Sequence, residues 1–335
     1  MSGEEFYTLR TYAPGDEEAI QRGFTEVFGV DRSLAQWRWK FLEPPRGARI
    51  VLAFDAADEL VCQYAAIDLD ILWAGAPTRA AQIVDVFSRR RRGLGRRGGA
   101  FERTLERFLA GCAAAVDGVA FVYGFPGERH QRAGTVTGHY FEPSAVERLS
   151  RQVGSAATAP AWRPARNWIS EGFDVHATDR LWQRSRERYP FATVRDAAWF
   201  RWRYERRPGG SYLQLGLRRA GELRAWAVVN LDATPESAHW VDLLWDGERA
   251  ADLAELAAAV EERAAARPAG VEGGGRAVEL WLRGDRSARE VLIDRGYSGR
   301  LEPLLRLSTI TFDPRVRVPE VLERFYLTMG DSDHF

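Results

Sequence analysis

The sequence predicts two related α/β domains arranged in tandem. Its 335 residues exceed the length of one typical domain, and 45% hydrophobic and 28% charged residues describe an ordinary globular chain. Apolar β-like runs alternate with amphipathic segments rich in Ala and Leu, a pattern typical of mixed α/β folds. The order of these segments in the first half recurs in the second half at a nearly constant offset, which indicates an internal repeat.

Each copy of the repeat begins with a helix followed by a hairpin. Residues 39–47 parallel residues 202–210, and both stretches open with a tryptophan and place an aromatic residue two positions later. At the same offset, residues 58–60 fall on residues 221–223, where we expect a tight hairpin turn in both copies. The flanking strands are apolar and β-like, at 50–54, 61–67, 212–217 and 224–230.

Each copy continues with a central strand, a long helix, a strand and a short helix. Val84-Asp85-Val86 corresponds to Val241-Asp242-Leu243, and amphipathic helices are predicted at 100–115 and 250–266. Further strands are predicted at 118–124 and 277–282, and Gly-aromatic pairs close the copies at Gly138-His139-Tyr140 and Gly296-Tyr297. We therefore place the domains at residues 1–151 and 165–335, joined by a linker at 152–164 that is rich in Ala, Ser, Thr, Gly and Pro.

Charge and cysteine content exclude several classes of protein. A formal net charge of zero supplies no overall field for nucleic acid or an anionic membrane. No apolar stretch is long enough to span a bilayer, and the start MSGEEFYTL lacks a signal-peptide pattern. The two cysteines, Cys62 and Cys112, rule out a disulfide framework or a cysteine zinc site. We expect a cytoplasmic protein that binds neither nucleic acid nor membrane.

Residues 83–101, IVDVFSRRRRGLGRRGGAF, predict an anion-binding turn in the first copy. An apolar run leads into arginines and glycines and then into a helix, so backbone N–H groups and the positive helix end gather at one place. Pyrophosphate is the anion most often held in this way. The second copy reads LLWDGERAA at this point, and its Asp246 and Glu248 would repel a pyrophosphate. A solvated charged turn is the alternative interpretation of Arg89 to Arg92.

The spacing Arg90-x-x-Gly93-x-Gly95 resembles the cofactor loop of the GNAT superfamily of acyl-CoA N-acyltransferases, whose signature is Gln/Arg-x-x-Gly-x-Gly/Ala. The order of elements in each copy is also similar to the GNAT order. The resemblance implies two tandem GNAT-like domains, each a mixed and mostly antiparallel sheet flanked by helices, the second being degenerate. It implies acetyl-CoA or another acyl-CoA as co-substrate, without a metal. The residues implied to bind it are Val86, Phe87, Arg90, Arg91, Arg92, Gly93, Leu94, Gly95, Arg96, Arg97 and Gly98.

Asp85 and Tyr140 are the predicted catalytic residues. Asp85 is a carboxylate in an otherwise apolar central strand, so it needs a partner or a chemical role. GNAT enzymes often place an acidic residue here as a base, whereas Asp242 at the matching place of the second copy favours a structural role equally. The tyrosine that usually protonates the leaving thiolate is replaced by Gly134, and Tyr140 is the predicted substitute. The alternatives are water, Tyr123 and His130.

The segment from Phe121 to His130 leaves the predicted strand where acceptor and thioester should meet. Its Gly-Phe-Pro-Gly resembles the Gly-Phe-Pro-Asn stretch of a subgroup of bacterial GNAT-like proteins. A capped helix start is the alternative interpretation. The predicted acceptor contacts are Tyr123, Phe125, Glu128 and His130. The C-terminal residues Asp331, Asp333 and His334 form only a weak metal-binding pattern, and a tail docked by Phe335 is the hypothesis for them.

These observations lead to the hypothesis of an N-acyltransferase, with an amine of a small molecule or amino sugar as acceptor. A non-catalytic acyl-CoA-binding or scaffolding module is one alternative. An aminoacyl transferase of the Fem type, which uses charged tRNA, is another, and the neutral net charge disfavours it. The second copy is expected to shape the acceptor pocket or to pair subunits into a homodimer, and a retained scaffold fits the sequence equally well.

Overall fold

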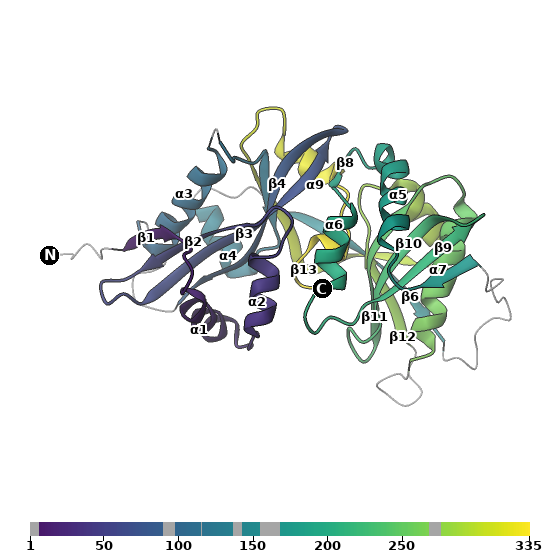
Figure 1. Ribbon diagram of the computed structural model, residues 1–335, viewed down its shortest axis with the longest axis horizontal. Coiled ribbons are helices and arrows are strands. Elements are labelled where there is room, and N and C mark those ends of the chain that lie inside the picture. Colours follow the sequence, from purple (N-terminus) through teal and green to yellow (C-terminus); the bar gives the residue numbers. More distant parts are fainter. Residues whose placement is uncertain (1–6, 90–97, 115, 137–142, 155–167, 268–275) are drawn as a thin grey trace. The chain divides into compact units, whose positions relative to one another are not determined.

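The protein folds into two compact units (Figure 1). The computed structural model describes residues 7–89, 98–114, 116–136, 143–154, 168–267 and 276–335. Unit 1 comprises Met1–Ile71, Pro77–Ser144 and Leu304–Leu322; unit 2 comprises Leu72–Ala76, Ala145–Pro303 and Glu323–Phe335. Residues 155–164 of the predicted linker lie outside the described residues.

Unit 1 is built on a mixed sheet with the strand order β1-β2-β3-β4-β5-β13. Its strands are β1 (Thr8–Thr11), β2 (Ala48–Phe54), β3 (Leu60–Trp73), β4 (Ala76–Ser88), β5 (Phe121–Gly124) and the second half of β13 (Ser298–Thr311). Its helices are α1 (Glu17–Phe28), α2 (Leu34–Phe41), α3 (Ala100–Cys112) and α4 (Glu128–Val136). The pairs β1·β2, β2·β3 and β5·β13 are antiparallel, and β4·β5 is parallel.

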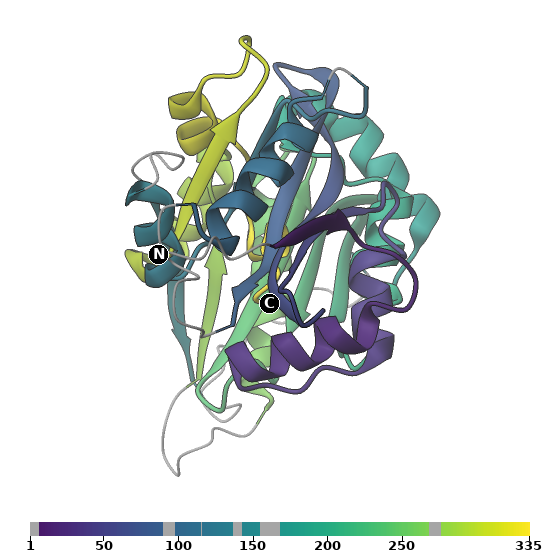
Figure 2. The same cartoon turned by 90° about the vertical axis from the view of Figure 1, so that its left-hand side faces the viewer.

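Helices cover both faces of the sheet in unit 1, with α1 and α2 on the side opposite to α3 (Figure 2). Helix α3 buries its apolar stripe in a core formed with the sheet by Val51, Tyr64, Ala66, Ala81, Leu105, Phe108, Cys112, Val119 and Val122. Helix α1 is amphipathic and ends at Gly29, whose φ of 70° is a left-handed cap. Helix α2 begins with a capping box in which Ser33 and Gln36 each satisfy the other's backbone N–H.

Unit 2 repeats this plan with the strand order β6-β12-β11-β10-β9-β7, in which β11·β12 is parallel and the other pairs with a described register are antiparallel. Its strands are β6 (Ser144–Val153), β7 (Ile169–Glu171), β8 (Phe191–Thr193), β9 (Leu213–Arg219), β10 (Glu222–Asn230), β11 (Ser237–Trp245) and β12 (Arg276–Trp281). Its helices are α5 (Val175–Ser185), α6 (Ala197–Phe200), α7 (Ala250–Ala265) and α8 (Arg286–Asp294), and α9 (Val318–Arg324) ends in it. A π-helical turn (Arg201–Glu205) follows α6, and 3₁₀ turns occupy Arg186–Arg188 and Met329–Asp331.

The closing strand of each copy belongs to the sheet of the other unit. Strand β6 follows α4 of the first copy but pairs with β12 of unit 2, along Arg148–Val153. The end of β13, from the second copy, pairs with β5 of unit 1 along Ser308–Thr311. The units therefore differ from the contiguous ranges 1–151 and 165–335, because a local apolar pattern identifies a strand but not its partner.

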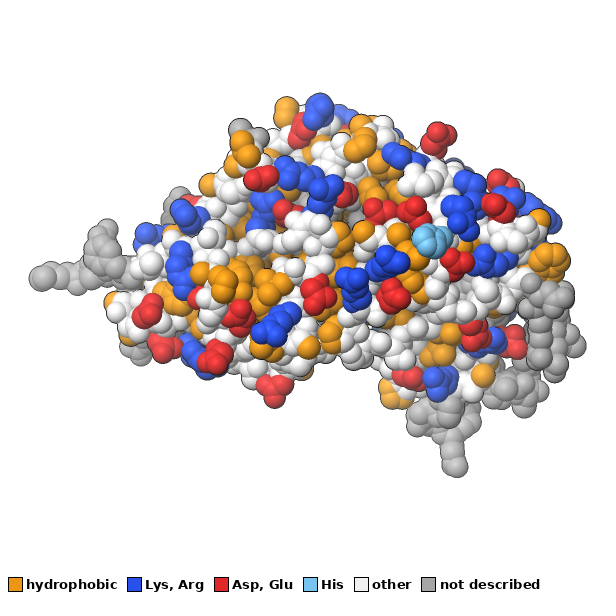
Figure 3. Space-filling view, in the orientation of Figure 1, with side chains coloured by type: hydrophobic (Ala, Val, Ile, Leu, Met, Phe, Trp, Pro, Cys, Tyr) orange, Lys and Arg blue, Asp and Glu red, His pale blue; other side chains and the backbone are white. Residues whose placement is uncertain are grey.

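Side chains of both charges are interspersed on the face seen in Figure 3, as the zero net charge leads one to expect. In the described part of the chain, no helix is both long and apolar enough to cross a membrane. The paired tryptophans of the repeat, Trp39 and Trp202, are both buried. These matched tryptophans therefore pack in the interior of each copy.

Candidate functional site

Strands β4 and β5 part at the centre of unit 1. Their parallel ladder joins Ala80–Gln82 to Phe121–Tyr123, and β5 ends at Gly124 while β4 runs on to Ser88. A Cβ at Gly124 would lie 3.1 Å from the Ile83 Cβ and 3.2 Å from its carbonyl oxygen, so glycine permits the last close approach of the two strands. The rest of β4 continues beyond the end of β5, and we call this place, where the pairing of the two strands ends, the opening of unit 1.

The free arm of β4 contains a β-bulge at Asp85. Ala81, Ile83 and Val86 all contact the core on the α3 side, whereas regular alternation would place residue 85 there. Asp85 has a φ of 48°, a left-handed conformation that residues other than glycine seldom adopt. The bulge sends Phe87 to the opposite face, where a Cβ added to Gly23 of α1 would lie 2.6 Å from its ring.

The Asp85 side chain is buried in a double ion pair. Lys40 of α2 places its Nζ 2.6 Å from Oδ1, and Arg32 donates to Oδ2. The carbonyl oxygen of Asp85 accepts a third hydrogen bond, 2.9 Å long, from Nε2 of Gln63 on β3. Arg32 is itself held by Gln21 of α1, whose Oε1 lies 2.8 Å from its NH2. The sequence indicated that this carboxylate needs a partner or a chemical role, and the structure supplies two cations as partners. A catalytic role for Asp85 stays a prediction.

The predicted pyrophosphate loop is bounded by described residues on both sides. Its members Arg90, Arg91, Arg92, Gly93, Leu94, Gly95, Arg96 and Arg97 lie outside the described residues, as does Tyr140. Arg89 before the loop binds Glu26 and Glu59, so its charge serves an ion pair. Gly98 after the loop has a φ of 76°, and α3 then begins at Ala100 with no side-chain cap at Gly99. The N-terminus of α3 therefore follows the loop directly.

The predicted acceptor residues do not all share one face of the sheet. Val122 belongs to the core on the α3 side, so Tyr123 beside it faces the other side, and its ring lies 6.5 Å from that of Phe125. His130 lies on the α3 side, with its ring centroid 5.5 Å from that of Phe101 and Nε2 3.5 Å from the Tyr64 hydroxyl. Glu128 is exposed in the first turn of α4.

Burial lowers the pKa of His130 to about 4, which keeps its imidazole neutral near pH 7. A neutral imidazole can accept a proton or a hydrogen bond, whereas an imidazolium can only donate.

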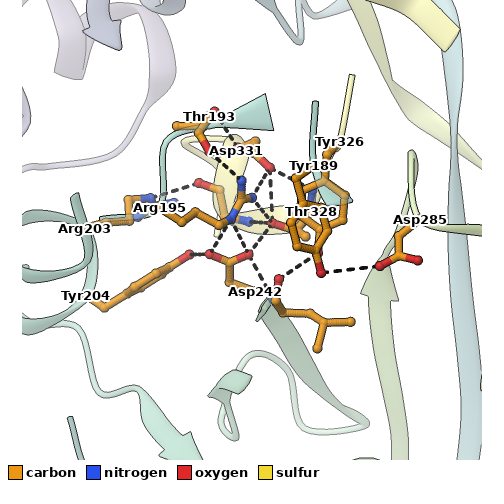
Figure 4. A network of polar contacts seen from close by, with 12 residues as sticks. Tyr189, Thr193, Arg195, Arg203, Tyr204, Asp242, Asp285, Tyr326, Thr328 and Asp331 are labelled. Carbon is orange, nitrogen blue, oxygen red and sulfur yellow. Dashed lines mark hydrogen bonds and ion pairs between the residues drawn. The ribbon is translucent and has the colours of Figure 1, made fainter. Parts of the chain in front are cut away.

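Unit 2 contains the same opening and the same ion pair. Strands β11 and β12 also pair over three residues, Ser237–His239 with Ala277–Glu279. Beyond this ladder Asp242 meets Arg195, with 3.2 Å between Oδ1 and Nε, and both side chains are fully buried (Figure 4). Arg195 corresponds to Arg32 in the repeat, because these two residues are separated by the same 163 positions as Trp202 and Trp39. Burial raises the pKa of Asp242, although the Arg195 charge opposes this shift.

The opening in unit 2 is filled by the chain's own C-terminal segment. The Tyr326 hydroxyl donates to the Leu243 carbonyl over 2.6 Å, and Leu327 pairs with Arg283 through hydrogen bonds of 3.0 and 3.2 Å. The Tyr189 hydroxyl accepts from the Trp245 N–H at 3.2 Å and donates to its carbonyl at 2.9 Å. Backbone groups of β11 and of Arg283, just after β12, are therefore already bound at this opening.

The tail continues over Asp242 and is docked, as the sequence hypothesis proposed. Asp331 places its Oδ2 2.7 Å from NH2 of Arg195, and Thr328 donates to Asp242 over 2.9 Å (Figure 4). The Phe335 ring lies 4.9 Å from the Trp281 ring, and its carbonyl accepts from Arg203 at 3.0 Å. Asp331 thus serves an ion pair, and the described residues contain no group of three His, Cys, Asp or Glu that could hold a metal.

A cavity of about 840 Å³ in unit 1 lies away from these residues. It is lined by β1, β2, the end of α2 and the outer face of α3, including Tyr12, Phe41, Arg49, Arg103 and Arg107. None of the predicted site residues lines it.

Arg32, Lys40 and Gln63 were not predicted as site residues. The sequence signal for the first two was the repeat itself, since Arg32 and Lys40 fall on Arg195 and Arg203. No local pattern pointed to Gln63, because its contact with Asp85 depends on strand pairing.

Residues 8–134 match the family model of the acetyltransferase (GNAT) domain. No curated protein matches the sequence. Among solved structures, a conserved protein of unknown function and probable N-acyltransferase from Enterococcus faecalis V583 is similar with a TM-score of 0.68 at 13% identity, over 92% of this chain and 73% of that one. A GCN5-related N-acetyltransferase from Kribbella flavida gives 0.61 at 15% identity, over 92% and 72%.

The N-myristoyltransferase of Saccharomyces cerevisiae, solved with bound myristoyl-CoA, has a TM-score of 0.56 at 10% identity, over 92% of this chain and 85% of that one. At these identities the likeness shows the fold. It covers nearly the whole chain, so the fold of each unit has counterparts in other solved chains.

Proposed function

We propose, from the premise that this chain contains a GNAT acetyltransferase domain within residues 8–134, that it is an N-acyltransferase. It transfers an acyl group from acyl-CoA, with acetyl-CoA as the default donor, to the amine of a small molecule or amino sugar. The contrast between the two openings carries the proposal. The opening in unit 2 is bound by the protein's own chain, so unit 1 is the unit left to take the cofactor.

The groups around the opening in unit 1 fit an acyl-CoA. Strand β4 supplies the arm with Val86 and Phe87, whose backbone N–H groups would bind the thioester carbonyl and the pantetheine arm. Helix α3 begins without a side-chain cap just after the Arg/Gly loop, and a helix start of this kind suits a pyrophosphate. Residues Arg90 to Arg97 and Gly98 would wrap that group.

The reaction proposed is a direct attack without an acyl-enzyme. The amine nitrogen bonds to the thioester carbonyl carbon, the C–S bond breaks, the amine loses a proton and the leaving thiolate gains one. Tyr140 remains the predicted acid. Tyr123 and Phe125 are the proposed acceptor contacts on the α1 and α2 side of the sheet, and Glu128 and His130 are kept as acceptor contacts at the start of α4.

One observation favours a second candidate, a non-catalytic acyl-CoA-binding module. Gly134, in the place of the family's tyrosine, is buried within α4, and no phenol can act from that position. An acyl-CoA-binding protein without turnover would need no such acid.

Calorimetric and thermal-shift titration with acetyl-CoA tests the proposal. The wild type should bind one equivalent per chain, and at a 100-fold excess over Kd the ligand should add about 2.7 kcal/mol of stability. Replacing Gly93 and Gly95 together by valine should abolish the shift and leave the unliganded melting temperature unchanged. Gly111→Val in α3, where an added Cβ meets no atom within 4 Å, is the control and should bind normally.

The outcomes separate the candidates. No stabilisation of the wild type would contradict the cofactor assignment, and two equivalents per chain would contradict the assignment to unit 1. Binding with thiol release across a panel of amines supports the transferase. Binding without any thiol release supports the module.

A further inference from the structure

The geometry assigns Lys40, Arg32 and Gln63 a positioning role. We infer that they lock the bulge of β4 at Asp85 and thereby orient the backbone N–H groups of the arm that meets the thioester. Asp85 is then a positioning residue and not the base. This inference rests on the proposed function for its catalytic consequence, but the lock itself concerns the free protein.

The conformation of Asp85 needs support from its surroundings. A left-handed backbone at a residue other than glycine is disfavoured by roughly tenfold in population. At a φ of 48° in the middle of a strand, Asp85 would relax toward an ordinary extended conformation if nothing held it. Relaxation would remove the bulge and shift Val86 and Phe87 to the opposite faces of the sheet.

Three elements hold Asp85 from two directions. Lys40 on α2 and Arg32 just before the α2 cap each take one carboxylate oxygen, and both side chains are about nine-tenths buried. Gln63 on β3 holds the carbonyl oxygen of the same residue at 2.9 Å. The Gln63 Oε1 is buried without a hydrogen-bond partner among the described residues, so its amide makes the contact to Asp85 at a cost in free energy.

A comparison with unit 2 shows which contacts of Asp85 occur in both units and which occur in unit 1. The Arg–Asp pair recurs as Arg195–Asp242, and the Asp242 carbonyl is held at 2.9 Å by Trp240 Nε1. A register shift opposite Val228 and Val229 also gives β11 a bulge beside Asp242. A base would have no function in unit 2, because the opening there is filled. The Arg–Asp pair therefore serves to hold the bulge.

Unit 1 adds two features to the shared pair. The described non-glycine residues with positive φ include Asp85 but none on β11. Lys40 binds Asp85, whereas Arg203 at the matching place binds the tail carbonyls of Gly330 and Ser332, at 3.1 and 2.7 Å. The more strained bulge thus has the additional cation.

Two variants distinguish a lock from a base. Gln63→Met leaves the carboxylate and both ion pairs in place, and Lys40→Met frees one carboxylate oxygen. If Asp85 is a base, the first change is nearly silent and the second leaves or raises kcat. If Asp85 positions the arm, both changes lower kcat/KM for acetyl-CoA by roughly tenfold, and Lys40→Arg restores most of it.

Hydrogen exchange of the unliganded full chain tests the lock independently of activity. Amides of Val84–Ser88 should exchange roughly tenfold faster in Gln63→Met and in Lys40→Met than in the wild type, with β10 unchanged. Arg46→Met, which removes an exposed cation paired with Asp70, is the control and should behave as the wild type in both measurements.

Unchanged exchange in Gln63→Met would overturn the lock, even if Lys40→Met fails to fold. Full or raised kcat in a folded Lys40→Met would overturn the positioning role and restore Asp85 as the base. A wild type that does not bind acetyl-CoA would overturn the proposed function, and the exchange result would still decide whether the bulge is locked.

Discussion

Single residues in this protein show how buried charge is tolerated when several elements share it. Arg195 is fully buried between two carboxylates, Asp242 and Asp331, which reach it from β11 and from the C-terminal segment. Each oxygen of Asp242 also accepts from a hydroxyl, of Thr328 or Tyr204, at 2.9 Å. Removing Arg195 would leave two buried carboxylates without the cation that both contact, and this makes the cluster sensitive to substitution.

We expect Arg195→Met to lower the free energy of unfolding by about 3 kcal/mol or more, because the buried carboxylates Asp242 and Asp331 would lose the cation that both contact. Urea unfolding followed by tryptophan fluorescence measures the change. Asp313→Asn breaks an ion pair with Arg315, whose side chain is exposed to solvent, and should cost far less stability. Equal losses in the two variants would contradict the importance of the buried cluster.

His130 predicts a pH dependence of stability. Burial lowers its pKa to about 4 in the folded chain, whereas the unfolded value is about 6.5. Between these values the unfolded chain binds more protons, so the free energy of unfolding should fall as the pH drops from about 6.5 to about 4, and should be unaffected by this group above that range. His239, whose pKa is also lowered to about 4, acts in the same direction.

His130→Phe should therefore reduce the slope of unfolding free energy against pH between 4 and 6.5, and by an amount similar to the reduction in His239→Phe, because the two pKa values are shifted similarly. Urea titrations at a series of pH values measure the slope. The same substitution at exposed His176 is the control. An unchanged slope in His130→Phe would show that this imidazole is not kept neutral by burial.

At the scale of elements, close approach of helix and strand decides which residues are tolerated. Helix α1 lies directly on Phe87, and Gly23 is the residue at the contact. Helix α3 contains Gly111 near its end, where an added Cβ would meet open space. Both glycines lie in amphipathic helices, and their packing is what distinguishes them.

Alanine at these two positions should have opposite effects. Gly23→Ala gains helix propensity but places its Cβ 2.6 Å from the buried Phe87 ring, so we expect a net loss of about 1–2 kcal/mol. Gly111→Ala should gain up to about 0.5–1 kcal/mol. Thermal unfolding of both variants measures the difference, and Phe87→Leu combined with Gly23→Ala should recover part of the loss. A stabilising Gly23→Ala would contradict the close packing.

For the whole molecule, the exchange of closing strands makes each unit depend on both halves of the sequence. Unit 1 takes Leu304–Leu322 from the end of the chain, and the end of β13 covers the edge of β5. Without that strand, β5 would present an unpaired edge that invites aggregation. The halves are therefore not independent folding units in the way that two contiguous domains would be.

We expect the full chain to unfold in a single calorimetric transition, because loss of either sheet removes a strand from the other unit. A chain ending at residue 143 should be insoluble or unfolded when expressed alone. Co-expression with residues 144–335 should restore a soluble complex. Two separate transitions in the full chain, or a folded first half, would contradict this expectation.

Local patterns were enough to predict much of the fold. The repeat and the order of helices and strands follow from periodicity and turn chemistry, which depend on residues close in sequence. The mixed, mostly antiparallel sheets were implied by the family resemblance. The hairpin turn at Asp58 indeed has a left-handed φ of 57°, and α7 lies at Ala250–Ala265 as predicted to within a residue. The Arg/Gly stretch could be recognised for the same reason, since a loop motif is contiguous.

The contacts that build the site could not be read in this way, because they join residues far apart in the chain. The partners of Asp85, the placement of His130 and Tyr123 on opposite faces, and the filling of the second opening by the tail all depend on which strands pair and in what register. The exchange of β6 and β13 has the same origin. The periodicity of a sequence shows which face of a strand is buried. Which element covers that face is determined by long-range packing alone.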